Sequence, residues 1–274
     1  MLGLGNSLVY QSGVFGIPYA NAFSTFFDGT DDLGTVASYN GVNPGADSAA
    51  GFSTSIWIYS TQSSAADIRS DRIFAKSGSG KAEYVCTIGG AGKPRFFLYF
   101  SNNTSAATRY RFVPNIVIQP NTWYHIVFVW DASVPTDEDH ALTGYINNVK
   151  YTNALGNTSI PQTPTAVGAS ATVTATDQTL EVGRQSIGGD YWKGYIDEFS
   201  IFNTVLSDSD VNAMYNSGEP TDLSSQAGLV GYWRMGEQDT GATITNLSSA
   251  AGATDMALVN GPAITDDGIA TSQP

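Results

Sequence analysis

Short runs of aromatic and β-branched residues recur along the chain between clusters of glycine, proline and asparagine. Such runs predict β-strands, and the clusters supply the backbone conformations that tight turns need. Eight segments have this character, and they are Phe52–Tyr59, Arg72–Ala75, Tyr84–Ile88, Arg95–Phe100, Trp123–Trp130, Leu142–Ile146, Leu180–Val182 and Gly194–Phe202. The pattern predicts an all-β fold in which two antiparallel sheets pack face to face.

Length and charge limit the number of domains and the kinds of partner that the chain can have. The chain has 274 residues, of which 42% are hydrophobic, so it can bury a full core in one main domain. Its 25 acidic and 12 basic residues give a net charge of −13. This charge repels a phosphate backbone, so we expect no nucleic-acid partner. The longest apolar stretches, such as Ile126–Trp130, are far shorter than the roughly 20 residues of a membrane helix, so we expect no membrane partner.

The single cysteine and the first residues limit the possible disulfides, zinc sites and sorting signals. Cys86 has no second cysteine to pair with, which excludes an internal disulfide and a Cys-x-x-Cys zinc site, so we expect it in the core. Residues 1–20 contain no Lys or Arg and are interrupted by glycines, which is not the pattern of a secretory signal. We expect these residues to form an N-terminal arm.

Two local motifs predict a helix and a hairpin. Ser207 and Asp210 have the spacing of a capping box, and apolar residues follow at helical intervals as far as Gly218. We expect one short helix there, covering an end of the sandwich. Asn147 and Asn148 separate two strand-like runs, and asparagine tolerates the positive φ of a two-residue hairpin turn.

Carboxylates stand inside or beside two of the strand-like runs, Phe26–Asp32 and Gly194–Phe202. A buried carboxylate is costly unless hydrogen bonds or a cation compensate its charge. We therefore expect the two strands to meet around backbone amides or a metal ion.

Five blocks in order resemble the laminin G-like family of concanavalin A-type jelly rolls. The blocks are Phe27–Asp32, Phe52–Ile58, Asn121–Asp131, Leu180–Arg184 and Gly194–Asn216. The resemblance implies a two-sheet antiparallel jelly-roll sandwich with one short helix.

The segment Gly228–Glu237, continuing to Pro262, resembles the strand and loop that usually precede the Phe-Asp-Gly block of this family, but here it follows the helix. It either completes the same sandwich, as in a circular permutation, or pairs with a neighbouring subunit; the usual closeness of domain termini favours the first. The expected organisation is an arm at 1–20, a jelly roll at 21–218, a C-terminal segment at 219–262 and a flexible tail at 263–274.

Calcium is the cofactor that the resemblance implies. Concanavalin A-type folds often hold a structural ion where the first and last strands of the repeat meet, and the matching positions are Asp28, Gly29 and Asp197. Oxygen ligands suit Ca²⁺. The alternative is that these acids cap turns and accept backbone hydrogen bonds without a metal. The acidic run Thr136–His140 is better explained as a solvated loop.

Enzyme activity is not expected. Glucanases of this fold carry Glu-x-Asp-x-x-Glu on one strand, and only Glu237 begins that pattern, with Ala242 in place of the third acid. Asp197 and Glu198 are adjacent, so regular strand alternation turns them to opposite faces. His125 and His140 are the only histidines, and His125 lies within a predicted strand, where a structural role is expected.

Three aromatic residues are candidates for ligand binding. Tyr110 stands between two arginines, and Tyr191 and Trp192 follow the glycine-rich turn that ends at Asp190. Exposed aromatic rings beside hydrogen-bonding groups can stack on sugars or anchor a protein partner. The alternative for the tryptophan is a loop that folds back onto the sandwich.

The glycine-rich start, Met1–Leu8, and the C-terminal segment resemble laminin G-like proteins of tailed bacteriophages. That resemblance implies a non-catalytic structural protein of the virion surface (capsid decoration, fibre or tail-associated), forming homo-oligomers, contacting other virion proteins and binding a glycan or the host surface. The alternative is an extracellular or cell-surface carbohydrate-binding module of bacterial origin, and a third reading is a glycoside hydrolase of the same fold.

Overall fold

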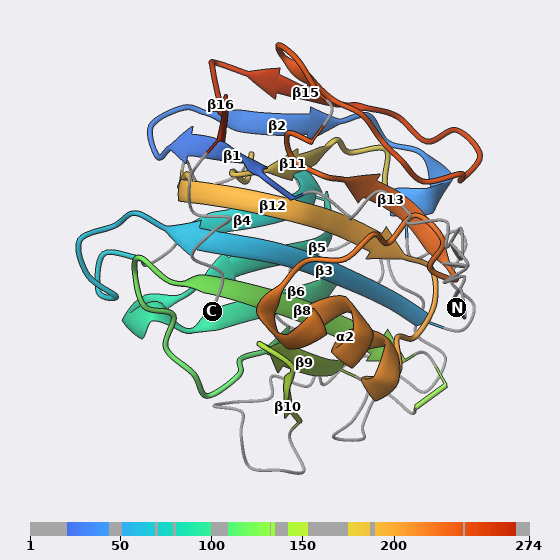
Figure 1. Ribbon diagram of the computed structural model, residues 1–274. Coiled ribbons are helices and arrows are strands. Elements are labelled where there is room, and N and C mark those ends of the chain that lie inside the picture. The colour runs from blue at the N-terminus through green and yellow to red at the C-terminus, as the bar shows by residue number, and fades with distance from the viewer. Residues whose placement is uncertain are drawn as a thin grey trace, which may run out of the picture.

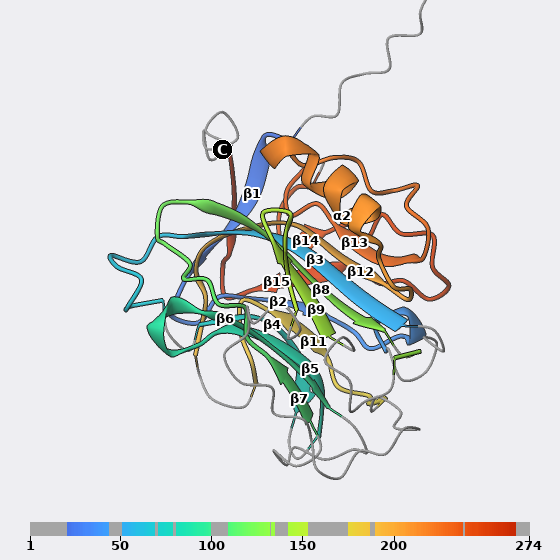
Figure 2. The same ribbon diagram turned by 90° about the horizontal axis from the view of Figure 1, so that it is seen from below.

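Two antiparallel sheets pack face to face in the computed structural model, as the sequence predicted (Figure 1). The structure describes residues 21–43, 51–68, 71–78, 81–99, 109–131, 133–134, 142–152, 175–186, 190–237 and 239–266. Figure 2 shows the two layers from their edge. The chain is thus an all-β sandwich of the jelly-roll type, and the main core lies between its layers.

The first sheet, sheet A, has eight strands within the described residues. In spatial order it contains β10 (Val149–Tyr151), β9 (Leu142–Ile146), β8 (Trp123–Asp131), β3 (Gly51–Ser60), β12 (Lys193–Phe202), β1 (Phe23–Asp28) and β16 (Ala263–Asp266), with β13 (Leu229–Trp233) also paired to β12.

The second sheet, sheet B, also has eight strands in the described part of the chain. Its order is β14 (Thr243–Ile244), β15 (Met256–Val259), β2 (Leu33–Val36), β11 (Leu180–Val182), β4 (Arg72–Gly78), β5 (Lys81–Ile88), β6 (Pro94–Tyr99) and β7 (Arg109–Phe112). All eight strand-like runs named from the sequence coincide with strands of these two sheets.

The hairpin and the helix follow their local signals. Asn147 and Asn148 have φ angles of 49° and 62° between β9 and β10, as the predicted turn requires. Helix α2 (Asp208–Tyr215) begins with the capping box of Ser207 and Asp210. Short 3-10 turns lie at Asn40–Val42 (η1), Gly90–Gly92 (η2) and Asn216–Gly218 (η5).

Helix α2 covers the outer face of sheet A (Figure 2). The prediction that it would cover one end of the sandwich was wrong. Val211 and Met214 pack against Val127 and Tyr145, which lie on the outer side of sheet A. Strands β8 and β12 present apolar residues on both sides of sheet A. The helix therefore shields the apolar residues of the outer side from water.

The C-terminal segment pairs with the first strands of the same chain. In Figure 1, β16 lies beside β1, and β15 lies beside β2. Trp233 of β13 stacks on Phe199 of β12 with ring centroids 5.5 Å apart. Ala263–Asp266, the first residues of the expected flexible tail, form β16 instead. The arm at 1–20 and residues 267–274 lie outside the described residues.

Cys86 is fully buried in the core, as predicted, and burial raises the pKa of its thiol. Among the described residues, no helix has the length and apolar character needed to cross a membrane.

Candidate functional site

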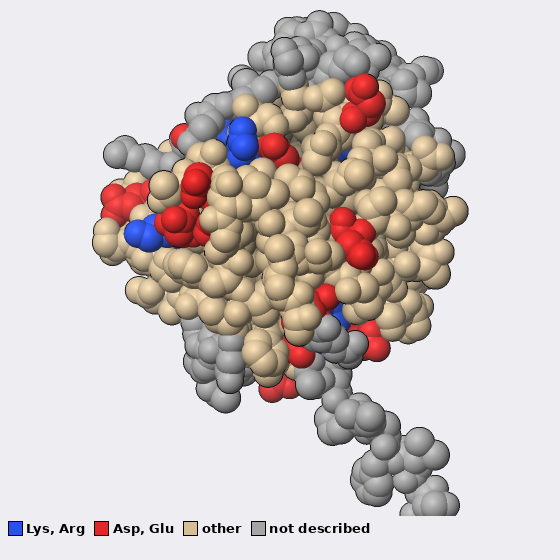
Figure 3. Space-filling view, turned by 90° about the horizontal axis from the view of Figure 1, so that it is seen from above, with Lys and Arg blue, Asp and Glu red and all other residues tan. Residues whose placement is uncertain are grey.

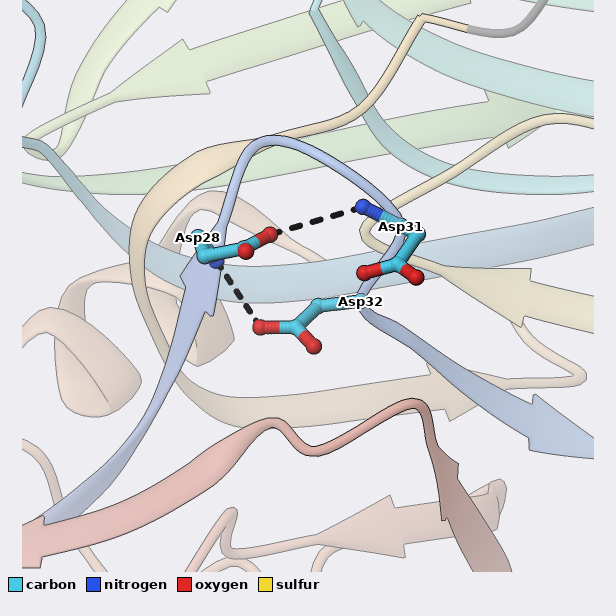
Figure 4. Close-up of side chains that lie close together, drawn as sticks. All are labelled: Asp28, Asp31 and Asp32. Carbon is cyan, nitrogen blue, oxygen red and sulfur yellow. Dashed lines mark hydrogen bonds between the residues drawn. The ribbon is translucent and has the colours of Figure 1, made fainter.

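The turn between β1 and β2 gathers three carboxylates (Figure 4). One oxygen from each of Asp28, Asp31 and Asp32 lies within 4.8 Å of the others. Asp28 Oδ1 accepts the backbone N–H of Thr30 at 2.7 Å, and Asp32 Oδ2 accepts the N–H of Asp28 at 2.9 Å. Gly29, with a φ of 79°, provides the left-handed backbone of the turn. These bonds fold the acidic segment back on itself.

The electrostatics of this acidic turn suit a cation. The backbone hydrogen bond from Thr30 lowers the pKa of Asp28, so its carboxylate is charged at neutral pH. Burial, and then the charges of Asp28 and Asp31, raise the pKa of Asp32. The donor atoms are carboxylate oxygens, which Ca²⁺ prefers. Asp28, Asp31 and Asp32 together could therefore hold a calcium ion.

Asp197 lies away from this turn, although β1 and β12 do meet as the sequence predicted. In their pairing, Asp28 faces Lys193, four residues before Asp197. At about 3.3 Å per residue, Asp197 is roughly 13 Å further along the sheet. The expected set of Asp28, Gly29 and Asp197 does not converge on one point. The antiparallel register is the reason, and Asp31 and Asp32 stand where Asp197 was expected.

Asp197 and Glu198 project from the same face of β12, contrary to the prediction from strand alternation. Asp197 faces Trp57 and Ser200 faces Ser55, so β12 holds one residue more than β3 at this point. This is a β-bulge, and Glu198 adopts a φ of 47° within it. The flanking Ile196 and Phe199 both lie in the core, which leaves the two acids on the outer side of sheet A.

The buried acids of sheet A are engaged in hydrogen bonds that join distant segments. Glu198 accepts the hydroxyl of Tyr232 and the Nε–H of Arg234, the latter at 3.1 Å. Asp197 accepts the amide of Asn21 at 2.8 Å. Glu237 accepts the backbone N–H groups of Ala22 and Phe23. These contacts hold the start of β1 and the end of β13 against β12, which is a structural role.

His125 also has a structural setting. Its ring stacks on Trp57 at 4.8 Å, and Nε2 lies 2.7 Å from the hydroxyl of Ser55. Burial lowers the pKa of His125 to about 3, so the ring is neutral at physiological pH. His140 and the acidic run Thr136–His140 lie outside the described residues.

The three aromatic candidates for ligand binding lie in different environments. Trp192 is fully buried in the core, so it cannot meet a ligand; the indole folds back onto the sandwich, where its Nε1 donates to the carbonyl of Tyr195 at 3.3 Å. Tyr191 is half-buried, and its ring centroid lies 5.6 Å from Cζ of Arg184. Tyr110 lies in β7, and only its backbone is among the described atoms.

A hollow of about 690 Å³ opens where β2 ends and β11 begins. Its polar lining combines hydroxyl, amide and carboxylate groups, and it consists of Ser38, Asn40, Asn43, Thr176, Asp177 and Thr179. We call this the β2–β11 hollow. No local sequence pattern predicts this hollow, because the two segments are more than a hundred residues apart and the pairing of Leu180 with Val36 brings them together.

A buried ion pair supports one wall of the β2–β11 hollow. Lys76 Nζ lies 2.5 Å from Glu83 Oε1, and both side chains are fully buried. Lys76 also donates to the carbonyl of Thr176 at 2.7 Å, and Glu83 accepts the hydroxyl of Thr176 at the same distance. On the other wall, Tyr39 donates its hydroxyl to the carbonyl of Val230. These hydrogen bonds therefore fix the positions of Thr176 and Tyr39 in the lining.

Residues 28–212 match the family described as the concanavalin A-like lectin/glucanases superfamily. The chain belongs to this superfamily. The described residues that line the β2–β11 hollow fall within the matched range, whereas β13 to β16 follow it. This concanavalin A-like sandwich therefore includes C-terminal strands from beyond the family match. No curated protein matches the chain.

Solved structures resemble this chain at low sequence identity. A Bacteroides ovatus protein inferred to bind carbohydrate is 13% identical with a TM-score of 0.56; the match covers 90% of this chain and 60% of that one. The heptameric SAP-like pentraxin of Limulus polyphemus is 16% identical with a TM-score of 0.48, covering 89% and 94%. Domain 4 of a Geobacillus stearothermophilus arabinanase, in complex with arabinotriose, is 17% identical with a TM-score of 0.44, covering 70% and 75%. At 13% identity, the likeness to the Bacteroides ovatus protein concerns the fold alone.

Proposed function

We propose that this protein is a non-catalytic carbohydrate-binding jelly roll of a virion surface. The main evidence for carbohydrate binding is the β2–β11 hollow. Its volume of about 690 Å³ lies within the range of roughly 300–1,000 Å³ that is usual for ligand pockets. Sugars present hydroxyl groups that both donate and accept hydrogen bonds, and the amides of Asn40 and Asn43 with the carboxylate of Asp177 complement them.

The lining of the β2–β11 hollow argues for binding without hydrolysis. Glycoside hydrolases of the usual kind need two carboxylic acids on either side of the bond that they break. Among the described lining residues, Asp177 is the single acid. The acids on the outer side of sheet A bond instead to Asn21, Tyr232, Arg234 and the backbone. The Bacteroides ovatus protein with this fold is likewise inferred to bind carbohydrate.

The virion surface is the finer part of the proposal. It is supported by the resemblance of Met1–Leu8 and the C-terminal segment to laminin G-like proteins of tailed bacteriophages. In this role the protein forms homo-oligomers and contacts other virion proteins, while the β2–β11 hollow meets a glycan or the host surface. A carbohydrate-binding module of a bacterial cell surface, or an extracellular one, is the second candidate, because the same hollow serves it equally well.

A glycan array tests carbohydrate binding directly. We expect the wild-type protein to bind a glycan, Asn40→Ala to lose most of that binding, and Asn212→Ala, on the exposed side of α2, to retain it. Binding that is equal in the wild type and Asn40→Ala would place the ligand elsewhere and contradict the role of the hollow. Release of reducing sugar from the bound glycan would contradict the non-catalytic assignment.

Mass spectrometry of purified virions tests the location. Peptides of this chain at stoichiometric abundance support the virion role. Their absence, combined with glycan binding by the isolated protein, would favour the cell-surface module.

A further inference from the structure

Three arginines lie in a row across the end of sheet B opposite the β2–β11 hollow. Arg72 at the start of β4 faces Thr87 on β5, which in turn faces Arg95 on β6. Arg184 is the second residue after β11, the strand on the other side of β4. Neighbouring strands lie about 4.8 Å apart, so the row spans roughly 15 Å. We call Arg184, Arg72 and Arg95 the arginine row.

The arginine row faces away from the core. Cys86 and Phe96, which neighbour Thr87 and Arg95 along their strands, belong to the core, so alternation turns Thr87 and Arg95 outward. Arg72 is on the same side, because its Nη1 donates to the hydroxyl of Thr87 at 3.0 Å. Its Nη2 lies 3.4 Å from a carboxylate oxygen of Asp190, the residue before Tyr191.

Each arginine of the row has an unsatisfied donor. Within the described structure, the Nε atoms of Arg72, Arg95 and Arg184 are buried and have no hydrogen-bond partner. These Nε atoms are shielded from solvent, but all three arginines are only half-buried, so a ligand would meet the parts of the guanidinium groups that stay accessible. Three such groups on neighbouring strands suit a ligand with several acceptor groups. Planar guanidinium groups match carboxylates in particular, through paired hydrogen bonds.

The surroundings of the arginine row are shaped for close approach. Arg95 runs over the backbone of Gly89, where an added methyl group would lie 1.8 Å from its Nε atom. The absence of a side chain at this glycine therefore lets the guanidinium lie flat on the sheet. At the other end of the row, the ring of Tyr191 lies 5.6 Å from Cζ of Arg184 and offers a face for stacking.

We propose that the arginine row binds an acidic polysaccharide through the carboxylates of its uronate residues. Asp190, which lies beside Arg72, favours this class over a nucleic acid or polyphosphate. A phosphate backbone presents only acceptors to this carboxylate, whereas a uronate polymer alternates carboxylates for the arginines with hydroxyl groups that can donate to Asp190. The net charge of −13 opposes any polyanion, so binding depends on these local contacts. The site extends the proposed carbohydrate binding to a second surface.

Calorimetric titration of the full chain with an alginate oligosaccharide tests the proposal. We expect binding by the wild type and about a tenfold or greater loss in Arg95→Gln and in Arg184→Gln. Arg184→Lys should lose most of this affinity as well, because lysine keeps the charge but not the fork of donors. Lys150→Gln removes a cation from sheet A and should bind like the wild type.

Three results would overturn the proposal. The first is wild-type affinity in both glutamine variants, with their melting temperatures unchanged. The second is an oligonucleotide of similar length that binds as tightly as alginate and loses affinity in the same variants. The third is loss of alginate binding in Asn40→Ala, which would move the uronate to the β2–β11 hollow and leave the proposed function standing without the arginine row.

Discussion

Arg234 and Glu198 form a buried ion pair in which Nε of the arginine lies 3.1 Å from Oε1 of the glutamate, with side chains 8% and 2% exposed. The pair joins the residue after β13 to the bulge of β12, so it connects the C-terminal segment to the centre of sheet A. The bulge makes this contact possible, because a regular strand would turn Glu198 toward the core.

Removing one partner of this pair should destabilise the fold. We expect Arg234→Met to lower the free energy of unfolding by about 3–5 kcal/mol, because Glu198 is left buried without its cation. Lys150→Met is a matched control, since its pair with Asp208 is exposed and contributes about 1 kcal/mol or less. Urea denaturation measures both. Equal losses in the free energy of unfolding would contradict this prediction, because the buried Glu198 pair would then contribute no more than the exposed Lys150 pair.

Calcium should stabilise the protein through the acidic turn, if Ca²⁺ is the structural ion that we propose for Asp28, Asp31 and Asp32. At a concentration about 100 times its Kd, calcium adds about 2.7 kcal/mol to stability, which corresponds to a rise in Tm of roughly 5–10 °C for a domain of this size. Calorimetry with calcium and with EDTA measures the shift. Asp32→Asn should abolish it and Glu219→Gln should keep it, whereas identical wild-type Tm values in both conditions would rule out the ion.

Asp71 should make stability depend on pH. Burial raises the pKa of this carboxyl to about 7, well above its usual 3.8. The folded protein thus holds the proton more tightly than the unfolded chain, and the resulting stability, fully present below about pH 4, is lost as the pH rises through 7.

Asp71→Asn should remove this dependence. We expect the variant to match the wild type at about pH 4 and to exceed its free energy of unfolding at pH 8 by roughly 2 kcal/mol, since one pKa unit is about 1.4 kcal/mol and water screens part of the effect. Denaturant titrations at the two pH values provide the comparison. Wild-type and variant profiles that stay parallel would contradict a neutral Asp71 in the folded state.

Deletion of the chain after Gly218 should prevent stable folding. The deletion removes β13, β15 and β16, which pair with β12, β2 and β1, and it uncovers Phe199 where Trp233 stacks. We expect an aggregating or unfolded product by circular dichroism, with folding restored by a separately added peptide of residues 219–274. A soluble monomer with the wild-type Tm would mean that these strands serve a neighbouring subunit instead.

Sequence alone predicted the parts of this fold that local signals specify. Ser207 and Asp210 mark the helix start, and Asn147–Asn148 mark a turn, because each acts within a few residues of itself. The resemblance to laminin G-like domains supplied the sandwich, which the family match confirms.

The remaining features depend on contacts between distant segments. The side on which Glu198 projects is decided by pairing with β3, and the burial of Trp192 by its packing into the main core. The β2–β11 hollow and the arginine row each require the register of several strands, which no single stretch of sequence encodes. The grouping of Asp31 and Asp32 with Asp28 is different, because the three acids are close in sequence. The glycine at position 29 marks the turn that brings them together, so this grouping was predictable from the sequence.

The low density of basic groups is visible on the face seen in Figure 3, where scattered acidic side chains interrupt a largely uncharged surface. Such a surface suits recognition by hydrogen bonding and local charge. It gives no broad electrostatic attraction to polyanions.

A crystal structure of the protein with a neutral glycan selected on the array tests the central claim most directly. The account predicts electron density for the sugar in the β2–β11 hollow, within hydrogen-bond distance of Asn40, Asn43 or Asp177. Density for the sugar confined to another surface, with the hollow filled only by solvent, would contradict it.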